Sequence, residues 1–267
     1  MTVVRVQTGH FGRTSGATGA YNPRLKLSEA DMNHWLAVEV EKQSVSVPQL
    51  SWQFVGPDER IGDPCHLFVA LHMDGSNNAS ASGPSVGYPP GSVESKRFGD
   101  MWKEARLSIP GALPFRSDNY TAALSGYYGH HSLYSGSAPV KIVIENGFVT
   151  NDSEAQWAQA YRPAIASALI ATVSRYYGLT GPTPIDNKDS TLPEPPSLEH
   201  RIAQLERKVE RTTQEVNPRQ GANINRLFEK IADLAARIAE QSATGVDERP
   251  LARIAELERF KAGIKAL

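Results

Sequence analysis

Four ionisable side chains stand where the chain leaves a predicted strand or enters a predicted helix. His10 and His72 follow short apolar segments, Glu145 ends a third, and Glu29 lies in the first turn of a predicted helix. Two imidazoles and one carboxylate, with a fourth position left open, form a common catalytic zinc set. A zinc ion in such a set lowers the pKa of bound water toward about 7, and a second carboxylate nearby can carry the proton.

Motifs for other common chemistries are absent from the sequence. It contains no H-E-x-x-H, no G-x-S-x-G and no P-loop. The glycine-rich run at residues 12–19 lacks the Lys-Ser/Thr ending of a phosphate-binding loop. Cys65 is the single cysteine, which excludes an internal disulfide and a cysteine-rich zinc site. A metal site must therefore consist of histidines and carboxylates.

The elements that must position these residues alternate between strands and helices over residues 1–179. Residues 28–31 (SEAD) have the form of a capping box, which predicts a helix that starts at Glu29. The alternation is typical of an α/β domain with helices on both faces of a mixed sheet, where ligands bind at the carboxyl ends of strands. The remaining apolar patterns predict strands at 3–7, 50–55, 65–71 and 140–145, and helices at 92–107 and 153–177.

The composition changes near residue 180. Residues 180–197 contain five prolines, which predicts a semi-extended linker. Residues 198–267 contain 13 Lys or Arg and 11 Asp or Glu among 70 residues, with apolar residues at heptad-like spacing. We therefore expect three parts: a domain at 1–179, the linker, and a C-terminal α-helical module. This module would form a helical bundle, a homo-oligomeric coiled coil or a targeting surface that binds a partner.

The overall charge argues against two classes of partner. The 28 Lys or Arg and 29 Asp or Glu residues give a net charge of −1, so no broad basic field exists for nucleic acid or an anionic membrane. No run approaches the roughly 18–20 apolar residues of a membrane span. The first residues, MTVVRVQTGHFGR, lack a signal-peptide pattern, so we expect synthesis in the cytoplasm without insertion into a membrane.

Four segments together resemble the zinc-dependent N-acetylmuramoyl-L-alanine amidases of the amidase-3 type. GHFGRTSGATG at 9–19 resembles the family's opening motif, and SEADMN at 28–33 resembles its E-x-x-x-N helix start. FVALHMDGSNN at 68–78 resembles the strand that ends in a zinc histidine. IVIENGFVTN at 142–151 resembles the E-x-G-F-x-x-N signature. The likeness covers roughly residues 3–179, and departures such as Phe11, Ser15 and Asp74 leave the four ionisable positions intact.

The resemblance implies one zinc ion held by His10, Glu29 and His72, with Glu145 as the catalytic general base and acid. The implied substrate is peptidoglycan, cut at the amide between N-acetylmuramic acid and the L-alanine of the stem peptide. Without a signal peptide, the chain would fit a bacteriophage endolysin that reaches the wall at host lysis. A particle-borne or prophage enzyme, another zinc amidohydrolase or peptidase, and a non-catalytic interaction protein are the alternatives.

Further polar residues are weaker candidates. Asp74, Tyr88 and His131 are possible substrate contacts beside the cleft. Glu39 and Glu41 are alternatives to Glu29 farther along the same helix. His130, beside His131, belongs to the same aromatic, glycine-rich stretch that could border the cleft. The other histidines have structural interpretations: His34 on a helix surface, His66 before a buried strand, and His200 in the C-terminal module.

Overall fold

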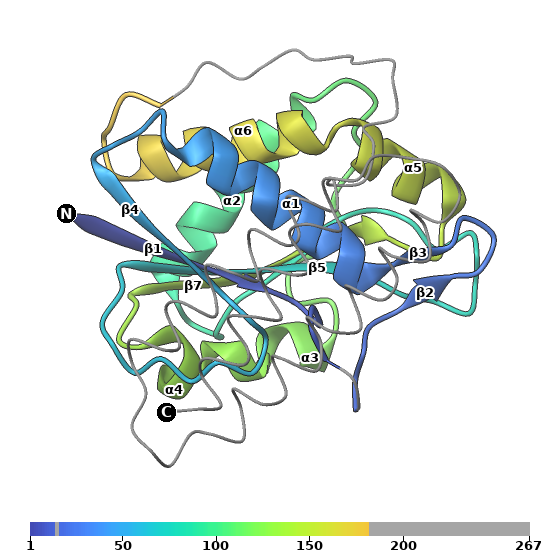
Figure 1. The fold of residues 1–267 in the computed structure, drawn as a ribbon, viewed down its shortest axis with the longest axis horizontal. Helices are drawn as coiled ribbons and strands as arrows, with labels where there is room; N and C mark the ends of the chain where they lie inside the picture. Colours follow the sequence, from blue (N-terminus) through green and yellow to red (C-terminus); the bar gives the residue numbers. More distant parts are fainter. Residues whose placement is uncertain (14–15, 182–267) are drawn as a thin grey trace, which may run out of the picture. The chain divides into compact units, whose positions relative to one another are not determined.

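A computed structural model describes residues 1–13 and 16–181 (Figure 1). The predicted helical module at 198–267, and the predicted linker from residue 182 on, lie outside the described residues. Among the residues that are described, none of the helices has both the length and the hydropathy that crossing a membrane requires.

A five-stranded sheet forms the centre of the domain, in the order β4-β1-β5-β7-β6. The pairs β1–β4, β1–β5 and β5–β7 are parallel, whereas β6 runs antiparallel to β7. The prediction of a mixed sheet is therefore confirmed. The strands of this sheet are β1 (Thr2–Thr8), β4 (Leu50–Val55), β5 (Leu67–Asp74), β6 (Ser85–Gly87) and β7 (Val140–Phe148), and a separate pair joins β2 (Tyr21–Asn22) to β3 (Leu27–Ser28).

Three helices cover one face of the sheet: α1 (Glu29–Ser44), α2 (Val93–Leu107) and α6 (Arg162–Tyr176) (Figure 1). Their apolar sides pack on alternate strand residues, among them Val6, Val69 and Ile142, which are fully buried. Each of these strand positions removes a β-branched side chain from water, and such residues suit a pleated, buried surface. This layer contains most of the buried apolar residues of the domain.

Shorter elements cover the opposite face: α3 (Ala122–Ser125), the 3-10 turn η1 (Tyr128–His130) and α4 (Ser132–Ser135) (Figure 1). Phe68, Ala70 and Val143 form a smaller apolar cluster beneath them. Because side chains alternate along a strand, the same face carries the next residues along, His72 on β5 and Glu145 on β7. We call this the site face.

The predicted helix at 153–177 is wrong in one respect, because the structure contains two helices there. Helix α5 (Asp152–Ala160) ends before Tyr161, and α6 begins at Arg162. Pro163 explains the break, since proline lacks an amide hydrogen and its ring clashes with the carbonyl four residues earlier in a continuous helix. In the first turn of a new helix, as here, proline is tolerated.

Candidate metal centre

The three predicted ligands come together at the carboxyl ends of the parallel strands. One ligand atom from each of His10, Glu29 and His72 lies within 4.8 Å of the others. Oε1 of Glu29 is 2.9 Å from Nδ1 of His72 and 3.4 Å from Nε2 of His10. The two imidazole rings meet edge to face, with centroids 4.9 Å apart. Residues separated by 62 positions in the sequence therefore form one cluster.

A tight turn after β1 positions His10. The amide of Gly9 donates to the carbonyl of Leu71 at 3.0 Å, which extends the β1–β5 pairing by one residue. A Cβ at Gly9 would lie 2.6 Å from that carbonyl oxygen and against the ring of His72, so only glycine fits. His10 itself has a φ of 59°, which is uncommon for a residue other than glycine and marks local strain at a functional position.

The start of α1 positions Glu29. Ser28 caps this helix by accepting a hydrogen bond from the Asp31 amide at 3.0 Å, as the capping-box pattern predicts. Glu29 is 4% exposed, and its carboxylate accepts hydrogen bonds from the backbone amides of Ala20 (3.0 Å) and Met73 (3.3 Å). Glu39, by contrast, pairs with Gln43 on the same helix.

Two asparagines hold the backbone that carries the histidines. The side-chain amide of Asn33 donates to the Gly9 carbonyl at 3.2 Å. The amide of Asn146 donates to the His72 carbonyl at 3.4 Å. Both asparagines are buried. Asn33 belongs to the E-x-x-x-N segment noted in the sequence, whereas nothing in the spacing singled out Asn146.

The protonation states of the cluster suit a cation. Burial by itself raises the pKa of Glu29, but the close contact with Nδ1 of His72 and the positive charge that both imidazoles can carry outweigh it and lower that pKa. Burial lowers the pKa of His72, although Glu29 opposes the change. A charged carboxylate and a neutral imidazole are the forms that bind metal ions. Because these donors are also the nitrogen and oxygen atoms that zinc prefers, the residues fit a zinc ion.

Glu145 lies on the strand next to His72. The two residues are register partners across β5 and β7 and share the site face. The Glu145 side chain is buried, and its Oε2 atom has no hydrogen-bond partner among the described residues. Burial raises the pKa of Glu145 well above its ordinary value, and the nearby carboxylates of Asp74 and Glu29 add to this effect. Such a carboxyl group is suited to accept and release a proton.

Asp74 lies two residues beyond His72, at the end of β5, and accepts a hydrogen bond from the hydroxyl of Tyr120. Burial raises the pKa of Asp74 above its ordinary value. The guanidinium of Arg116 lies 4.6 Å from the centre of the Tyr120 ring, so a cation borders this side of the site. The charge of the Asp74 carboxylate is one of the causes that raise the pKa of Glu145.

Tyr88 does not lie beside the cleft, which differs from the sequence-based expectation. It is 7% exposed, belongs to the larger apolar core, and donates its hydroxyl to Asp118 at 2.8 Å. The helix-surface interpretation of His34 is also wrong. That side chain is buried, and its ring stacks on Phe11 with centroids 3.8 Å apart. The pattern of a single helix could not reveal a loop folding over it.

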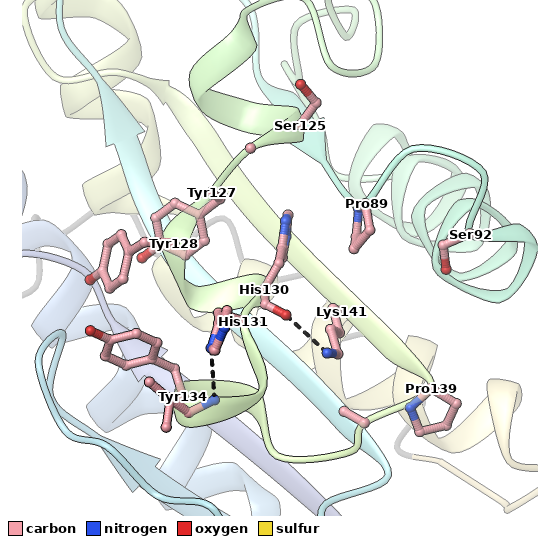
Figure 2. Close-up of a pocket in the computed structure, with 13 residues that line it drawn as sticks. Pro89, Ser92, Ser125, Tyr127, Tyr128, His130, His131, Tyr134, Pro139 and Lys141 are labelled. Atoms are coloured by element: carbon pink, nitrogen blue, oxygen red, sulfur yellow. Dashed lines mark hydrogen bonds between the residues drawn. The ribbon is translucent and has the colours of Figure 1, made fainter.

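His131 is exposed and lines an open pocket of about 760 Å³ beside the elements that cover the site face (Figure 2). Its Nδ1 accepts the Leu133 amide hydrogen and so caps α4. Tyrosine rings make up much of the pocket wall: Tyr127, Tyr128 and Tyr134. Tyr127 belongs both to this pocket and to the surroundings of the candidate metal centre, because its hydroxyl lies 2.8 Å from Nε2 of His72.

Tyr127 and Gln7 are not among the predicted site residues. The Tyr127 hydroxyl donates to Oε1 of Gln7 at 2.6 Å, and Gln7 is fully buried on β1. A signal for Gln7 exists in the sequence, because Arg5 and Gln7 alternate with valines in the first strand. Polar residues at every second position of an otherwise apolar strand indicate a polar site on one face.

The described domain has the fold of known amidase catalytic domains. No family model and no curated protein matches the sequence. Among solved structures, the catalytic domain of CwlV, an N-acetylmuramoyl-L-alanine amidase from Bacillus (Paenibacillus) polymyxa var. colistinus, is similar with a TM-score of 0.54. It is 19% identical, and the match covers 67% of this chain and 100% of that one.

Two further structures agree with this likeness. An N-acetylmuramoyl-L-alanine amidase from Clostridium difficile 630 is 19% identical, with a TM-score of 0.50 over 67% of this chain and 98% of that one. The amidase AmiC2 of Nostoc punctiforme is 18% identical, with a TM-score of 0.50 over 66% of this chain and 97% of that one. At these identities the comparisons establish the shared fold, which agrees with the fold that the resemblance implied.

Proposed function

We propose that this chain is a zinc-dependent peptidoglycan amidase. Its substrate is the amide between the lactyl group of N-acetylmuramic acid and the L-alanine of the stem peptide. The observation that carries the proposal is the convergence of His10, Glu29 and His72, with Glu145 on the neighbouring strand. The likeness to amidase catalytic domains supports the choice of bond.

His10, Glu29 and His72 would hold the zinc ion through two imidazole nitrogens and one carboxylate oxygen. A bound zinc ion polarises the scissile carbonyl and makes water a better nucleophile near neutral pH. The chain contributes one carboxylate and two imidazoles, each fixed by hydrogen bonds to other parts of the domain. Such fixed ligands keep the geometry of a metal site constant during the reaction.

Glu145 performs the proton transfers in this proposal. Its carboxylate accepts a proton from the water molecule that attacks the lactyl carbonyl carbon. The same proton goes to the alanine nitrogen as the carbon–nitrogen bond breaks, which yields a carboxylic acid and a free amine. Burial beside Asp74 makes the protonated form of Glu145 accessible, so one residue can both take up and release the proton.

Digestion of defined muropeptides, followed by mass spectrometry, tests the function. The expected products are stem peptides with a new free alanine amino terminus, formed only when the chelator is absent or zinc has been restored. New reducing sugars, or cleavage between amino acids of the stem, would point to a different hydrolase. The Glu145→Gln variant, assayed at equal zinc content, is the matched control for contaminating activity.

That the chain is a bacteriophage endolysin that acts at host lysis remains a prediction from the sequence. Asp74 and His131 likewise remain predicted substrate contacts. The predicted oligomerisation through residues 198–267 concerns residues outside the described part of the chain.

A further inference from the structure

A chain of hydrogen bonds leads from a backbone carbonyl to the metal-ligand candidate His72. The side-chain amide of Gln7 donates to the Pro57 carbonyl at 3.1 Å. The hydroxyl of Tyr127 donates to Oε1 of Gln7 at 2.6 Å and lies 2.8 Å from Nε2 of His72. The four residues come from four different segments of the sequence, so only the folded domain creates this chain.

The hydrogen bond between Gln7 and the Pro57 carbonyl fixes the direction of the other hydrogen bonds in the chain. A carbonyl oxygen only accepts, so the NH₂ group of Gln7 must face Pro57 and its Oε1 must face Tyr127. Because Oε1 also only accepts, the hydroxyl proton of Tyr127 points toward Gln7. The hydroxyl oxygen then faces His72 with a lone pair, which requires a proton on Nε2 of the imidazole.

We propose that Tyr127 and Gln7 are positioning residues that hold neutral His72 in the Nε2-protonated tautomer and so present Nδ1 to the metal. The bare Nδ1 lies 2.9 Å from Oε1 of Glu29. Two electron-rich atoms at this distance repel each other unless a cation lies beside them. The tautomer therefore favours the metal-bound state, and the inference rests on the proposed function through its metal ligands.

His10 is held in the other tautomer, with its proton on Nδ1, by a single hydrogen bond to the backbone. Its Nδ1 lies 2.6 Å from the carbonyl oxygen of Ala17, which only accepts, so Nδ1 carries the proton. Nε2 of His10 is then bare and lies 3.4 Å from Oε1 of Glu29. Both bare nitrogens thus face the same carboxylate oxygen. A backbone carbonyl, that of Ala17, fixes the tautomer of His10 directly. The Pro57 carbonyl fixes that of His72 through the side chains of Gln7 and Tyr127.

Zinc affinity of the full chain, measured by competition with a chelating dye, gives the first test. Tyr127→Phe removes the hydroxyl and keeps the ring, and we expect a loss of roughly 10–100-fold, which is typical when a partner of a metal ligand is removed. Tyr134→Phe is the matched control. This tyrosine lines the same pocket, and its ring packs on that of Tyr128 with centroids 5.1 Å apart (Figure 2). Its affinity should stay within about twofold of wild type, since outer-shell losses require contact with a ligand.

The second test reads the tautomer directly by nitrogen NMR of the histidine rings. His72 of the wild-type chain should carry its proton on Nε2, both before and after zinc is added. In Gln7→Leu the Tyr127 hydroxyl is free to donate to Nε2, so the proton of His72 should move to Nδ1 in the zinc-free protein. His10 should keep its Nδ1 proton in every variant, because its partner is a backbone carbonyl.

Two results would overturn the inference: a wild-type His72 protonated on Nδ1, or wild-type zinc affinity in both Tyr127→Phe and Gln7→Leu. If either variant fails to fold, the wild-type ring spectrum decides alone. Neither measurement needs a substrate. A wild-type chain with the expected tautomer and zinc affinity but no amidase activity would overturn the proposed function and leave this inference standing.

Discussion

His72 and Glu145 are paired neighbours on adjacent parallel strands, and both side chains lie on the site face. The pairing brings a buried carboxyl group next to a metal-ligand candidate. Glu29, from the start of α1, completes the ligand group instead of Glu145. The two carboxylates therefore differ in pKa: that of Glu29 is lowered and that of Glu145 is raised. Opposite shifts in neighbouring carboxyl groups are typical of a division between ligand and proton carrier.

Replacing Glu145 with glutamine should abolish proton transfer and spare zinc binding. We expect the turnover of muropeptides to fall by about 10²–10⁴-fold, the usual contribution of a general acid–base group. Zinc content, measured by elemental analysis, should match that of wild type. Glu104→Gln is the control, since this glutamate is exposed and forms a surface ion pair with Arg175. Near-full activity of Glu145→Gln on purified walls would rule out the proposed role.

Replacing His72 with alanine should lower zinc occupancy. The loss removes one of three protein ligands, so we expect most of the metal to be lost on dialysis. His66→Ala is the matched control because His66 precedes the same strand but accepts the Val3 amide hydrogen, at the end of the sheet remote from the ligands. If His72→Ala and wild type retain the same zinc content, other residues hold the metal.

Zinc should stabilise the folded chain. Binding to the native state alone adds about 2.7 kcal/mol when free zinc is 100 times its dissociation constant. Thermal unfolding with and without zinc measures this effect, and the shift in Tm should vanish in His10→Ala. Magnesium should give no comparable shift, because it prefers oxygen ligands in octahedral geometry. Equal stabilisation by both ions would contradict a site made of two imidazoles and a carboxylate.

The zinc-free chain should lose stability as the pH rises, and Glu145 should account for part of this loss. Its pKa is raised in the folded state, so the native chain keeps a proton that the unfolded chain releases above about pH 4.5. The contribution of Glu145 to the free energy of unfolding is therefore complete below that pH and is lost as the pH rises through its folded-state pKa. The free energy of unfolding falls by at most about 1.4 kcal/mol per pH unit on this account.

Glu145→Gln should flatten this dependence. Urea unfolding of both proteins in the presence of a chelator, at several values between about pH 5 and pH 8, measures the difference. The glutamine variant should be the more stable of the two at the upper end of this range, because it places no charge in the buried position. Parallel curves for the two proteins would show that Glu145 titrates at its ordinary pKa.

Replacing Arg5 should lower the free energy of unfolding more than replacing an exposed arginine does. Its fully buried guanidinium donates to the side chain of Gln53 and to the carbonyls of Ile61 and Asp63, all at 3.0–3.1 Å. Arg5→Ala leaves these acceptors unpaired, at about 1–3 kcal/mol each, so we expect a loss of at least about 3 kcal/mol in urea unfolding. Arg175→Ala, which breaks an exposed pair with Glu104, should cost under about 1 kcal/mol.

Much of the fold could be predicted because its signals are local. The apolar runs placed β1, β4 and β7 to within a few residues, and the Ser28 cap placed the start of α1. The direction of parallel strands then implied that His10 and His72 end at the same edge of the sheet. Pro163 was available to predict the break between α5 and α6, but the amphipathic pattern continues across it and concealed the break.

Environments that depend on distant segments could not be predicted in this way. Tyr88 is buried in the core, where its hydroxyl donates to Asp118, 30 residues later in the chain. Tyr127 contacts His72 across 55 residues and Gln7 across 120. A strand or helix pattern states which residues share a face, but not which loop will cover that face.

The order of residue types along the chain was enough to nominate His10, Glu29, His72 and Glu145, because strand direction and helix capping depend on near neighbours. The tertiary structure decided which nitrogen of each imidazole faces Glu29 and how deeply Glu145 is buried. Those properties depend on hydrogen-bond partners and excluded water, which are supplied by segments that meet only when the whole domain has folded.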